Sequence, residues 1–571
     1  MASISSGYDP LQHTSIYQRK EDSDDSDGES GMGNVNRFIV RPPGHSGKAK
    51  RGHLCFDASF ETGNLGRVDL VNEFEYDLYI RPDTCSPRFR FWFNFTVDNV
   101  KQDQRVIFNI VNMSKGRNLF NNQMTPLVKS TSRNKWQRIP KEYVFYYKSL
   151  NHHGHYVLSF SFGFDKEDEV FQFALASPYS YSKLQTFLKV LESKASYLKN
   201  NFKRECIANS LQNRRLEAIT VGANNKTDGE NKKRIVAVMA RIHPGESPSS
   251  FVCQGLLEIL ISSSSLATAL REHIAFKIMP MMNPDGVFVG NYRSDILGVD
   301  LNRSWHVATP FSHPNIYAIL QMLKSLDNSE QEQLDFVIDI HAHSSLKGCF
   351  IYGNTYEDVY RYERHILFPK LLAASALDYG KDQTMFNSDT SKNGTSRRHL
   401  CCALSSKVNS YTLEVSIFGY TSKDSDQIIP YTEDSCILIY KRCGMNLIKA
   451  FLEYYHCIGA IPLQPVKEIP TKNRRSRRRK LRKPELIRSS RCRETALVHF
   501  KDININYDSE ISIEDNSYKM MKSPRRILKS TNRIYEEFTP KFQQNFKESD
   551  PPILVVMPEP TLSIIDLNEM L

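Results

Sequence analysis

Residues 234–261 read RIVAVMARIHPGESPSSFVCQGLLEILI, an apolar run joined by a short polar turn to a second apolar stretch. Residues 234–240 have the length and composition of a buried strand, whereas residues 249–261 are typical of a helix. Further strand-like runs follow at residues 274–281, 334–340 and 411–415. Because strands alternate with helices here, we predict an α/β domain over residues 183–457.

Upstream of this segment, apolar and polar residues alternate with a period of two. The alternating stretches are residues 74–80, 89–97, 106–110 and 156–164. Period two is typical of half-buried strands, so we predict an antiparallel β-sandwich domain over residues 52–182. Apolar residues at helical spacing over 184–191 then indicate an amphipathic helix at the junction with the α/β domain.

The two ends of the chain have compositions that do not favour folding. Residues 1–50 are polar and contain the acidic cluster EDSDDSDGE at 21–29. Residues 458–571 lack periodicity and include a basic run at 472–483, with nine Lys or Arg and no acidic residue. Removing these nine charges from the net +11 leaves +2 on the rest of the chain. We therefore expect a disordered acidic arm, a flexible basic tail, and only local basic recognition by the folded body.

Length and composition favour a soluble protein with two folded units. The chain has 571 residues, and 40% of them are hydrophobic, which is enough to build two cores. No apolar run approaches the roughly 20 residues of a membrane span, and the acidic arm does not resemble a secretory signal. The 11 cysteines show no C-x-x-C spacing, which favours reduced thiols. We expect a cytosolic protein without membrane contact.

Two histidines and one glutamate lie at the ends of predicted strands. His243 and Glu246 belong to the turn HPGE after the first strand, and His341 directly follows the third. Residues past strand ends meet at one edge of an α/β sheet, so these three side chains can converge. Two His and one Glu are a common zinc ligand set in hydrolases. We predict one bound Zn2+ ion; the alternative is that both histidines are hydrogen-bonded core residues.

Several motifs around these residues resemble those of zinc carboxypeptidases, most closely the cytosolic carboxypeptidase subfamily of tubulin deglutamylases. They are HPGESPSSF (243–251), NPDGVFVGNYR (283–293), GVDLNRSW (298–305), DIHAHS (339–344) and YTLEVS (411–416). Residues 56–84 resemble the β-domain that precedes the catalytic domain in this subfamily. The resemblance covers about residues 52–456. It implies a zinc carboxypeptidase-like α/β/α domain with a mixed sheet, which removes residues from protein C-termini.

The resemblance also implies roles for residues around the metal. Glu414 matches the family's catalytic glutamate, a base for hydrolysis, and Arg293 matches the arginine that stabilises the oxyanion. Asn302 and Arg303 match the pair that binds the substrate's C-terminal carboxylate, for which an arginine offers planar, bidentate geometry. Asp300 matches the carboxylate that orients the first histidine ligand by accepting its remaining ring N–H.

The expected side-chain preference depends on KNGTSR at residues 392–397. Lys392 and Arg397 match positions where the subfamily places basic residues in the pocket for the terminal side chain. Ser396 departs from the pattern, because the stretch reads GTSR where GTGR is usual. The resemblance implies removal of glutamate from polyglutamate side chains or from acidic C-termini, those of tubulin included.

Two other functions remain open at this point. A metallo-deacylase of a small acidic amide would share the H-x-x-E…H ligands, although the carboxylate clamp and the separate β-domain argue against it. A catalytically inactive microtubule-binding protein would account for the basic tail, although no ligand or base is missing. The basic run also leaves nuclear import and a weak contact with nucleic acid open, but it has no interleaved aromatics on which bases could stack.

Overall fold

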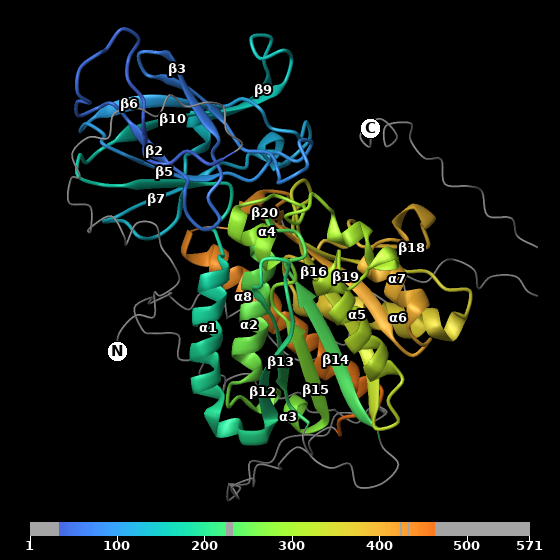
Figure 1. Cartoon of the computed structure of the whole chain (residues 1–571). Helices are drawn as coiled ribbons and strands as arrows, with labels where there is room; N and C mark the ends of the chain where they lie inside the picture. Colours follow the sequence, from blue (N-terminus) through green and yellow to red (C-terminus); the bar gives the residue numbers. More distant parts are fainter. Residues whose placement is uncertain (1–32, 224–231, 423–424, 432, 463–571) are drawn as a thin grey trace, which may run out of the picture. The chain divides into compact units, whose positions relative to one another are not determined.

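A computed structural model describes residues 33–223, 232–422, 425–431 and 433–462. The acidic cluster, the basic run and the chain from residue 463 lie outside these residues. A β-rich domain comes first and leads through α1 (Tyr181–Lys194) into an α/β domain (Figure 1). Among the described helices, none alone is long and apolar enough to cross a bilayer; only α2 (Ser247–Leu260) and α3 (Ser265–His273) together reach that length and apolarity, and they are bent by 89°.

The β-domain packs two sheets against each other. The first sheet has the order β1 (Phe38–Ile39), β2 (Cys55–Asp57), β5 (Asn94–Asp98), β11 (Phe171–Ala174), β7 (Leu127–Ser130) and β8 (Gln137–Arg138). The second has the order β3 (Arg67–Asn72), β4 (Glu75–Tyr79), β6 (Gln104–Ile110), β10 (Tyr156–Phe164) and β9 (Val144–Lys148). Phe95 and Phe173 from the first sheet meet Phe108 and Phe160 from the second, with ring centroids 5.6 to 6.3 Å apart. The predicted alternation therefore corresponds to side chains that fill this core.

Two details of the β-domain differ from the sequence-based expectation. β1 lies within residues 1–50, which were expected to form a disordered arm, and it pairs with β2. Val40 next to it is buried, and Val35 N donates to Leu65 O, so a few apolar residues anchor this otherwise polar stretch. The β-domain thus begins before residue 52. In addition, β4 and β6 pair in parallel, whereas the other strand pairs of this domain are antiparallel.

The α/β domain is built on one eight-stranded mixed sheet. Its order is β12 (Phe202–Asn209), β13 (Arg215–Val221), β15 (Ile274–Met279), β14 (Lys233–Ala240), β16 (Glu332–His343), β19 (Asn409–Ser416), β17 (Cys349–Asn354) and β18 (Met385–Asn387). The central strands β15, β14, β16 and β19 are parallel, so their carboxyl ends lie at the same edge. The predicted fold class is confirmed, and the four predicted strands are these central ones.

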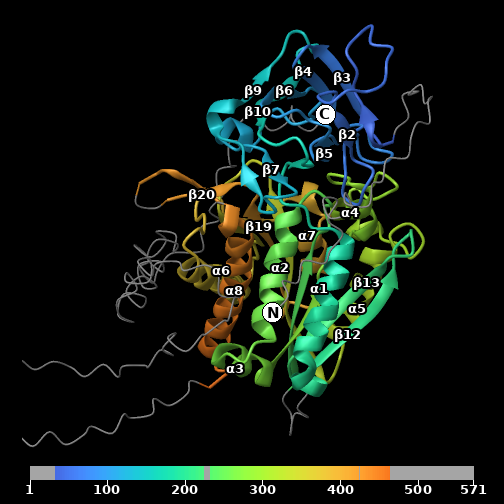
Figure 2. The same cartoon turned by 90° about the vertical axis from the view of Figure 1, so that its left-hand side faces the viewer.

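Helices cover both faces of this sheet. The core on one face contains side chains from α1, α2, α3, α6 (Val359–Ser375) and α8 (Glu433–Cys457), and Figure 2 looks onto α1, α2 and α8. The core on the other face contains side chains from α5 (Pro314–Asp327) and α7 (Ser396–Ala403). α4 (Pro284–Val289) and a short β20–β21 hairpin (Gly419–Thr421, Ile428–Pro430) complete the domain. This arrangement is an α/β/α sandwich.

Candidate metal centre and active site

The first two candidate ligands lie in the turn between β14 and α2. His243 follows the end of β14 at Ala240, and Glu246 is the N-cap residue of α2. A glycine is required at 245, because a Cβ there would lie 2.7 Å from the Tyr292 ring and 2.9 Å from Tyr292 O. Gly245 N also donates to Tyr292 O at 2.7 Å. The turn therefore packs directly against the segment that carries Arg293.

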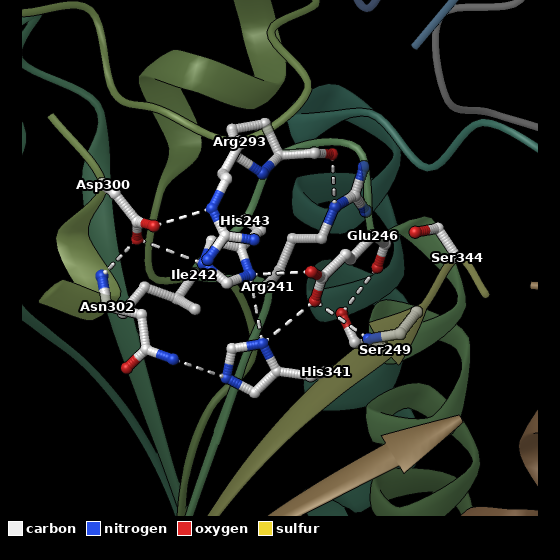
Figure 3. Close-up of polar contacts among 12 residues, drawn as sticks. Arg241, Ile242, His243, Glu246, Ser249, Arg293, Asp300, Asn302, His341 and Ser344 are labelled. Atoms are coloured by element: carbon white, nitrogen blue, oxygen red, sulfur yellow. Dashed lines mark hydrogen bonds and ion pairs between the residues drawn. The ribbon is translucent and has the colours of Figure 1, made fainter. Parts of the chain in front are cut away.

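The three candidate ligands converge at the carboxyl edge of the sheet (Figure 3). His243 Nδ1 lies 2.7 Å from Glu246 Oε1, and His341 Nδ1 lies 3.0 Å from Glu246 Oε2. The two Nδ1 atoms are 3.2 Å apart, and all three residues are buried. Within the described ranges, this is the one group of three or more His, Cys, Asp or Glu whose ligand atoms all lie within 4.8 Å of one another. His341 lies inside β16, not after its end, because that strand continues to His343.

The outward-facing ring nitrogens of both histidines are held by carboxylates. His243 Nε2 lies 3.2 Å from Asp300 Oδ1, and His341 Nε2 lies 2.9 Å from Asp339 Oδ2. Each carboxylate favours the tautomer that leaves Nδ1 free to bind a metal. Burial alone would raise the pKa of Glu246, but the two histidines hold it well below its usual range, so its carboxylate is ionised. Two imidazoles and one carboxylate with oriented rings fit a zinc ion.

Glu414 and Arg293 lie close to this cluster. Glu414 sits on β19 directly opposite His341 in the strand register, and burial raises its pKa to about 7, helped by the negative charges of Glu246 and Asp339. Arg293 Nε donates to Asp300 Oδ2 at 2.6 Å. Among the described residues, the terminal nitrogens of Arg293 donate no further hydrogen bond. A carboxyl group with a pKa of about 7 and an arginine with unused donors therefore lie close to the metal ligands.

Asn302 and Arg303 occupy the 3-10 turn Leu301–Arg303, which Asp300 caps. Asn302 N donates to Asp300 Oδ1 at 2.9 Å, and its Nδ2 lies 3.3 Å from His341 Nε2. Arg303 lies at the exposed edge of the site, where it donates to Asn302 O at 3.0 Å. Desolvation and the charge of Arg293 lower the pKa of Arg303. The guanidinium groups of Arg293 and Arg303 thus both lie near the metal ligands, which suits a carboxylate ligand.

The chain is similar to known proteins over most of its length. A family model described as zinc carboxypeptidase matches residues 187–437, and one described as the cytosolic carboxypeptidase N-terminal domain matches residues 56–174. Cytosolic carboxypeptidase 6 of Mus musculus is 48% identical to the chain, over 74% of this chain and 77% of the mouse protein. The chain belongs to the cytosolic carboxypeptidase family. The Caenorhabditis elegans protein of the same name is 43% identical, over 71% of this chain and 88% of its own.

Solved structures agree with the fold of this cytosolic carboxypeptidase. A metallo-carboxypeptidase from Burkholderia cenocepacia aligns with a TM-score of 0.59 at 20% identity, over 71% of this chain and 99% of that one. A Pseudomonas aeruginosa metallo-carboxypeptidase in complex with (2-guanidinoethylmercapto)succinic acid aligns with a TM-score of 0.58 at 20% identity, over 71% and 99% of the two chains. The chain is therefore a zinc metallocarboxypeptidase, and His243, Glu246 and His341 are the residues that fit its zinc.

The two basic residues expected in the specificity pocket of this carboxypeptidase lie in different surroundings. Lys392 ends the 3-10 turn Thr390–Lys392 and is partly exposed. Arg397 is buried in α7 and donates to Gly353 O, and to the side-chain oxygens of Asn354 and Asn387 at 2.9 and 3.0 Å. Burial and the neighbouring Arg398 lower the pKa of Arg397 to about 10. Arg397 is thus held by the protein itself, whereas Lys392 has more freedom to reach a substrate.

The sequence-based prediction assigned no role at the site to three residues that lie near it. Asp339 lies two positions before His341 on β16, so the period of a strand places both on one face and could have indicated it. Ser396 donates its hydroxyl to Asp339 Oδ2 and its backbone N–H to Asn302 Oδ1. Asp83 of the β-domain contacts the segment around Arg293. Nothing in the local sequence signals these last two contacts, because their partners are far away along the chain.

Proposed function

We propose that this carboxypeptidase removes glutamate from polyglutamate side chains or from acidic C-termini of proteins, with tubulin among its substrates. The observation that carries the proposal is the contact between the basic segment at 392–398 and the predicted carboxylate clamp. Trp305 N donates to Gly394 O at 3.2 Å, and Ser396 N donates to Asn302 Oδ1 at 2.9 Å. On this proposal, the positive charges of the 392–398 segment would lie near the terminal residue of a substrate bound by the clamp.

The roles of the chain's own residues follow from their positions. A zinc ion at His243, Glu246 and His341 would polarise the scissile carbonyl and activate water. Asn302 and Arg303 bind the terminal carboxylate of the substrate, which places the last peptide bond at the metal ligands. Only a chain end supplies that carboxylate, so the pair restricts cleavage to the terminal residue.

Glu414 handles the proton during cleavage. Its carboxylate accepts a proton from the attacking water and passes it to the leaving amine, a transfer that is efficient when the pKa of the base is close to the working pH. A pKa raised to about 7 meets that condition. Arg293 donates its terminal N–H groups to the carbonyl oxygen as negative charge develops there, a contact worth about 3 kcal/mol in the transition state.

The proposal is tested with zinc-loaded enzyme and peptides that share one body and end in several glutamates, in leucine or in lysine. Mass spectrometry should show stepwise loss of glutamyl residues from the first peptide and little loss from the other two. Glu414→Gln should abolish the loss while zinc content stays at one ion per chain. Equal cleavage of all three peptides would refute the preference for glutamate. No cleavage by the wild type, with retention of tubulin tails, would favour a binding protein.

Charge reversal tests the side-chain pocket separately. Lys392→Glu should raise KM for the glutamate peptide at least about 10-fold, because a like charge then faces the substrate's terminal side chain. Lys407→Glu is the matched control, since Lys407 is exposed and lies beyond the other end of α7. An unchanged KM in Lys392→Glu would show that Lys392 does not contact the substrate's terminal side chain.

We also propose that the enzyme works in the cytosol, as the names of its relatives suggest for them, and that it associates with microtubules through its substrate. The tail that carries the basic run lies outside the described residues. Its predicted contacts with acidic surfaces, nucleic acid or the nuclear import machinery stay predictions. Cosedimentation of the full chain with microtubules, with and without residues 463–571, separates a contribution of the tail from that of the catalytic site.

A further inference from the structure

Several of the contacts between the β-domain and the catalytic domain fall on one continuous segment, residues 288–294. Thr62 N donates to Phe288 O at 3.0 Å, and Asn64 Nδ2 donates to Gly290 O at 2.9 Å. Thr84 N donates to Asn291 Oδ1 at 3.1 Å. This segment includes the last six residues of the NPDGVFVGNYR motif, with Arg293 among them. The backbone that carries Arg293 is therefore held by side chains and amides of another domain.

Asp83 makes the densest of these contacts. Its Oδ1 accepts from Tyr292 N at 2.6 Å, and its Oδ2 accepts from Arg293 N at 2.8 Å and Ser294 N at 2.7 Å. Ser294 Oγ donates to Oδ2 as well, at 2.8 Å. Asp83 is 2% exposed, and burial raises its pKa while the three amides and the hydroxyl oppose that rise. One carboxylate thus fixes three consecutive amides, and an uncharged side chain could not match that set of donors.

The side chain of Arg293 is fixed from its other end. Its Nε is bound to Asp300 Oδ2, and Asp300 also orients His243. The Phe89 ring of the β-domain lies 6.0 Å from the guanidinium carbon of Arg293. The guanidinium therefore has little freedom once its backbone is held, and its position depends on Asp83 at one end and Asp300 at the other.

We infer that Asp83 is a positioning residue, through which the β-domain holds Arg293 in the place where it can donate to the oxyanion. This inference rests on the proposed role of Arg293. The β-domain is then part of the catalytic apparatus, and the carboxylate that fixes Arg293 comes from a position more than two hundred residues earlier in the chain. A displacement of a donor by about 1 Å can lower a rate 100-fold, so a loosened segment should be visible in kinetics.

The test compares the full-length wild type with Asp83→Asn, which keeps the size of the side chain but turns an NH2 group towards amide donors. We expect kcat on the glutamate peptide to fall on the order of 10-fold to 100-fold, with KM and zinc content unchanged. Hydrogen exchange at the amides of Tyr292, Arg293 and Ser294 should become faster. Ser294→Ala, which removes only one donor, should show the same signature with a smaller loss, and it keeps the inference testable if Asp83→Asn does not fold.

A matched control and a double-mutant cycle exclude a merely structural effect. Asp77 is also a buried carboxylate of the β-domain, 7% exposed, but its partners Asn109 and His152 belong to the same domain. Asp77→Asn should leave kcat unchanged. In an Arg293→Ala background, Asp83→Asn should cost little further activity, because the group that it positions is gone.

The outcomes distinguish this inference from the proposed function. If the wild type does not cleave the glutamate peptide, the proposed function fails. If the wild type cleaves and Asp83→Asn has the same kcat, the inference is wrong. It is equally wrong if the losses from Asp83→Asn and Arg293→Ala multiply in the double variant, since Asp83 would then act independently of Arg293.

Discussion

At the scale of single residues, Glu414 has surroundings that suit a base. It is paired with His341 on the adjacent parallel strand. Its pKa is raised to about 7 by burial and by the nearby carboxylates Glu246 and Asp339. Burial raises this pKa because the ionised carboxylate loses its contact with water, which makes the charged form of Glu414 less stable. A carboxyl group kept near neutrality at the edge of a metal cluster is typical of catalytic sites.

This pKa predicts the pH dependence of the reaction. Above the pKa the Glu414 carboxylate is ionised and can accept a proton; below it the group is neutral and cannot. We expect kcat/KM to decrease as the pH falls, with a midpoint at or below about 7, because the positive charge of bound zinc favours the carboxylate. A pH–rate profile measures this directly. A kcat/KM that stays constant from about pH 8 down to about pH 5 would contradict the assignment.

The residues at the site differ in how far the sequence could predict them. His243, Glu246 and His341 were predictable, because each follows an apolar run that the sequence itself indicates. The resemblance added Glu414 and the residues around Asp300, but it could not say that Arg397 is engaged by the protein. Asp83 could not be predicted, since its partners at 292–294 become neighbours only when two domains pack together.

At the scale of elements, the start of α7 connects the proposed side-chain pocket with the candidate metal site. Ser396 donates to Asp339 Oδ2, and Asp339 holds the outer nitrogen of His341. Ser396→Ala removes this support from the carboxylate that orients a zinc ligand. We expect the dissociation constant for zinc to rise about 10-fold, as is usual when such an outer hydrogen bond is lost. Competition with a chelating dye measures this on the metal-free protein.

Ser391→Ala is the control for this prediction. Its hydroxyl donates to Asp389 in the adjacent exposed 3-10 turn, and it has no hydrogen bond to the metal-ligand residues or to Asp339 among the described residues. Its zinc affinity should equal that of the wild type. Equal zinc affinity in Ser396→Ala as well would show that the unusual GTSR sequence has no effect on the metal.

The elements of the catalytic domain were predictable where hydrophobic periodicity was strong. α2 begins at Ser247, close to the expected 249, because its apolar residues are regularly spaced. β16 was expected to end at 340, yet it continues to His343, since polar residues of the site interrupt its apolar pattern. The strands β17 and β18 were not predicted; β18 has only three residues at the sheet edge, and so short a stretch carries too little periodicity.

At the scale of the whole described unit, the β-domain contacts a segment of the catalytic domain, residues 288–294, that carries Arg293. The sequence indicated a β-domain and an α/β domain, but hydrophobic patterns carry no information about which surfaces meet. The contacts at 288–294 depend on close approach of two backbones, seen at Gly290. This residue has φ +76°, and a Cβ there would lie 2.2 Å from Gly63 O of the β-domain. A glycine is therefore needed at 290 for two reasons: the backbone is left-handed there, and a Cβ would clash with the β-domain.

Gly290→Ala should consequently disturb both stability and the coupling between the domains. A left-handed alanine costs about 1 to 2 kcal/mol, and forcing apart the two backbones costs about 1 to 3 kcal/mol more. Calorimetry should show a lower Tm and a broader or divided transition, because the domains lose part of their shared contact. The kcat should fall as well, since residues 292–294 follow directly.

Gly154→Ala separates the two causes. Gly154 has φ +77°, nearly the same as Gly290, but the nearest atom to a Cβ there is Lys148 Cε at 3.5 Å, an ordinary contact. It lies in a loop of the β-domain after β9, so its alanine variant bears only the conformational cost. We expect a single transition with a modest decrease in Tm and an unchanged kcat. If Gly290→Ala behaved in the same way, the close approach at Gly63 would contribute nothing to the joint stability of the two domains.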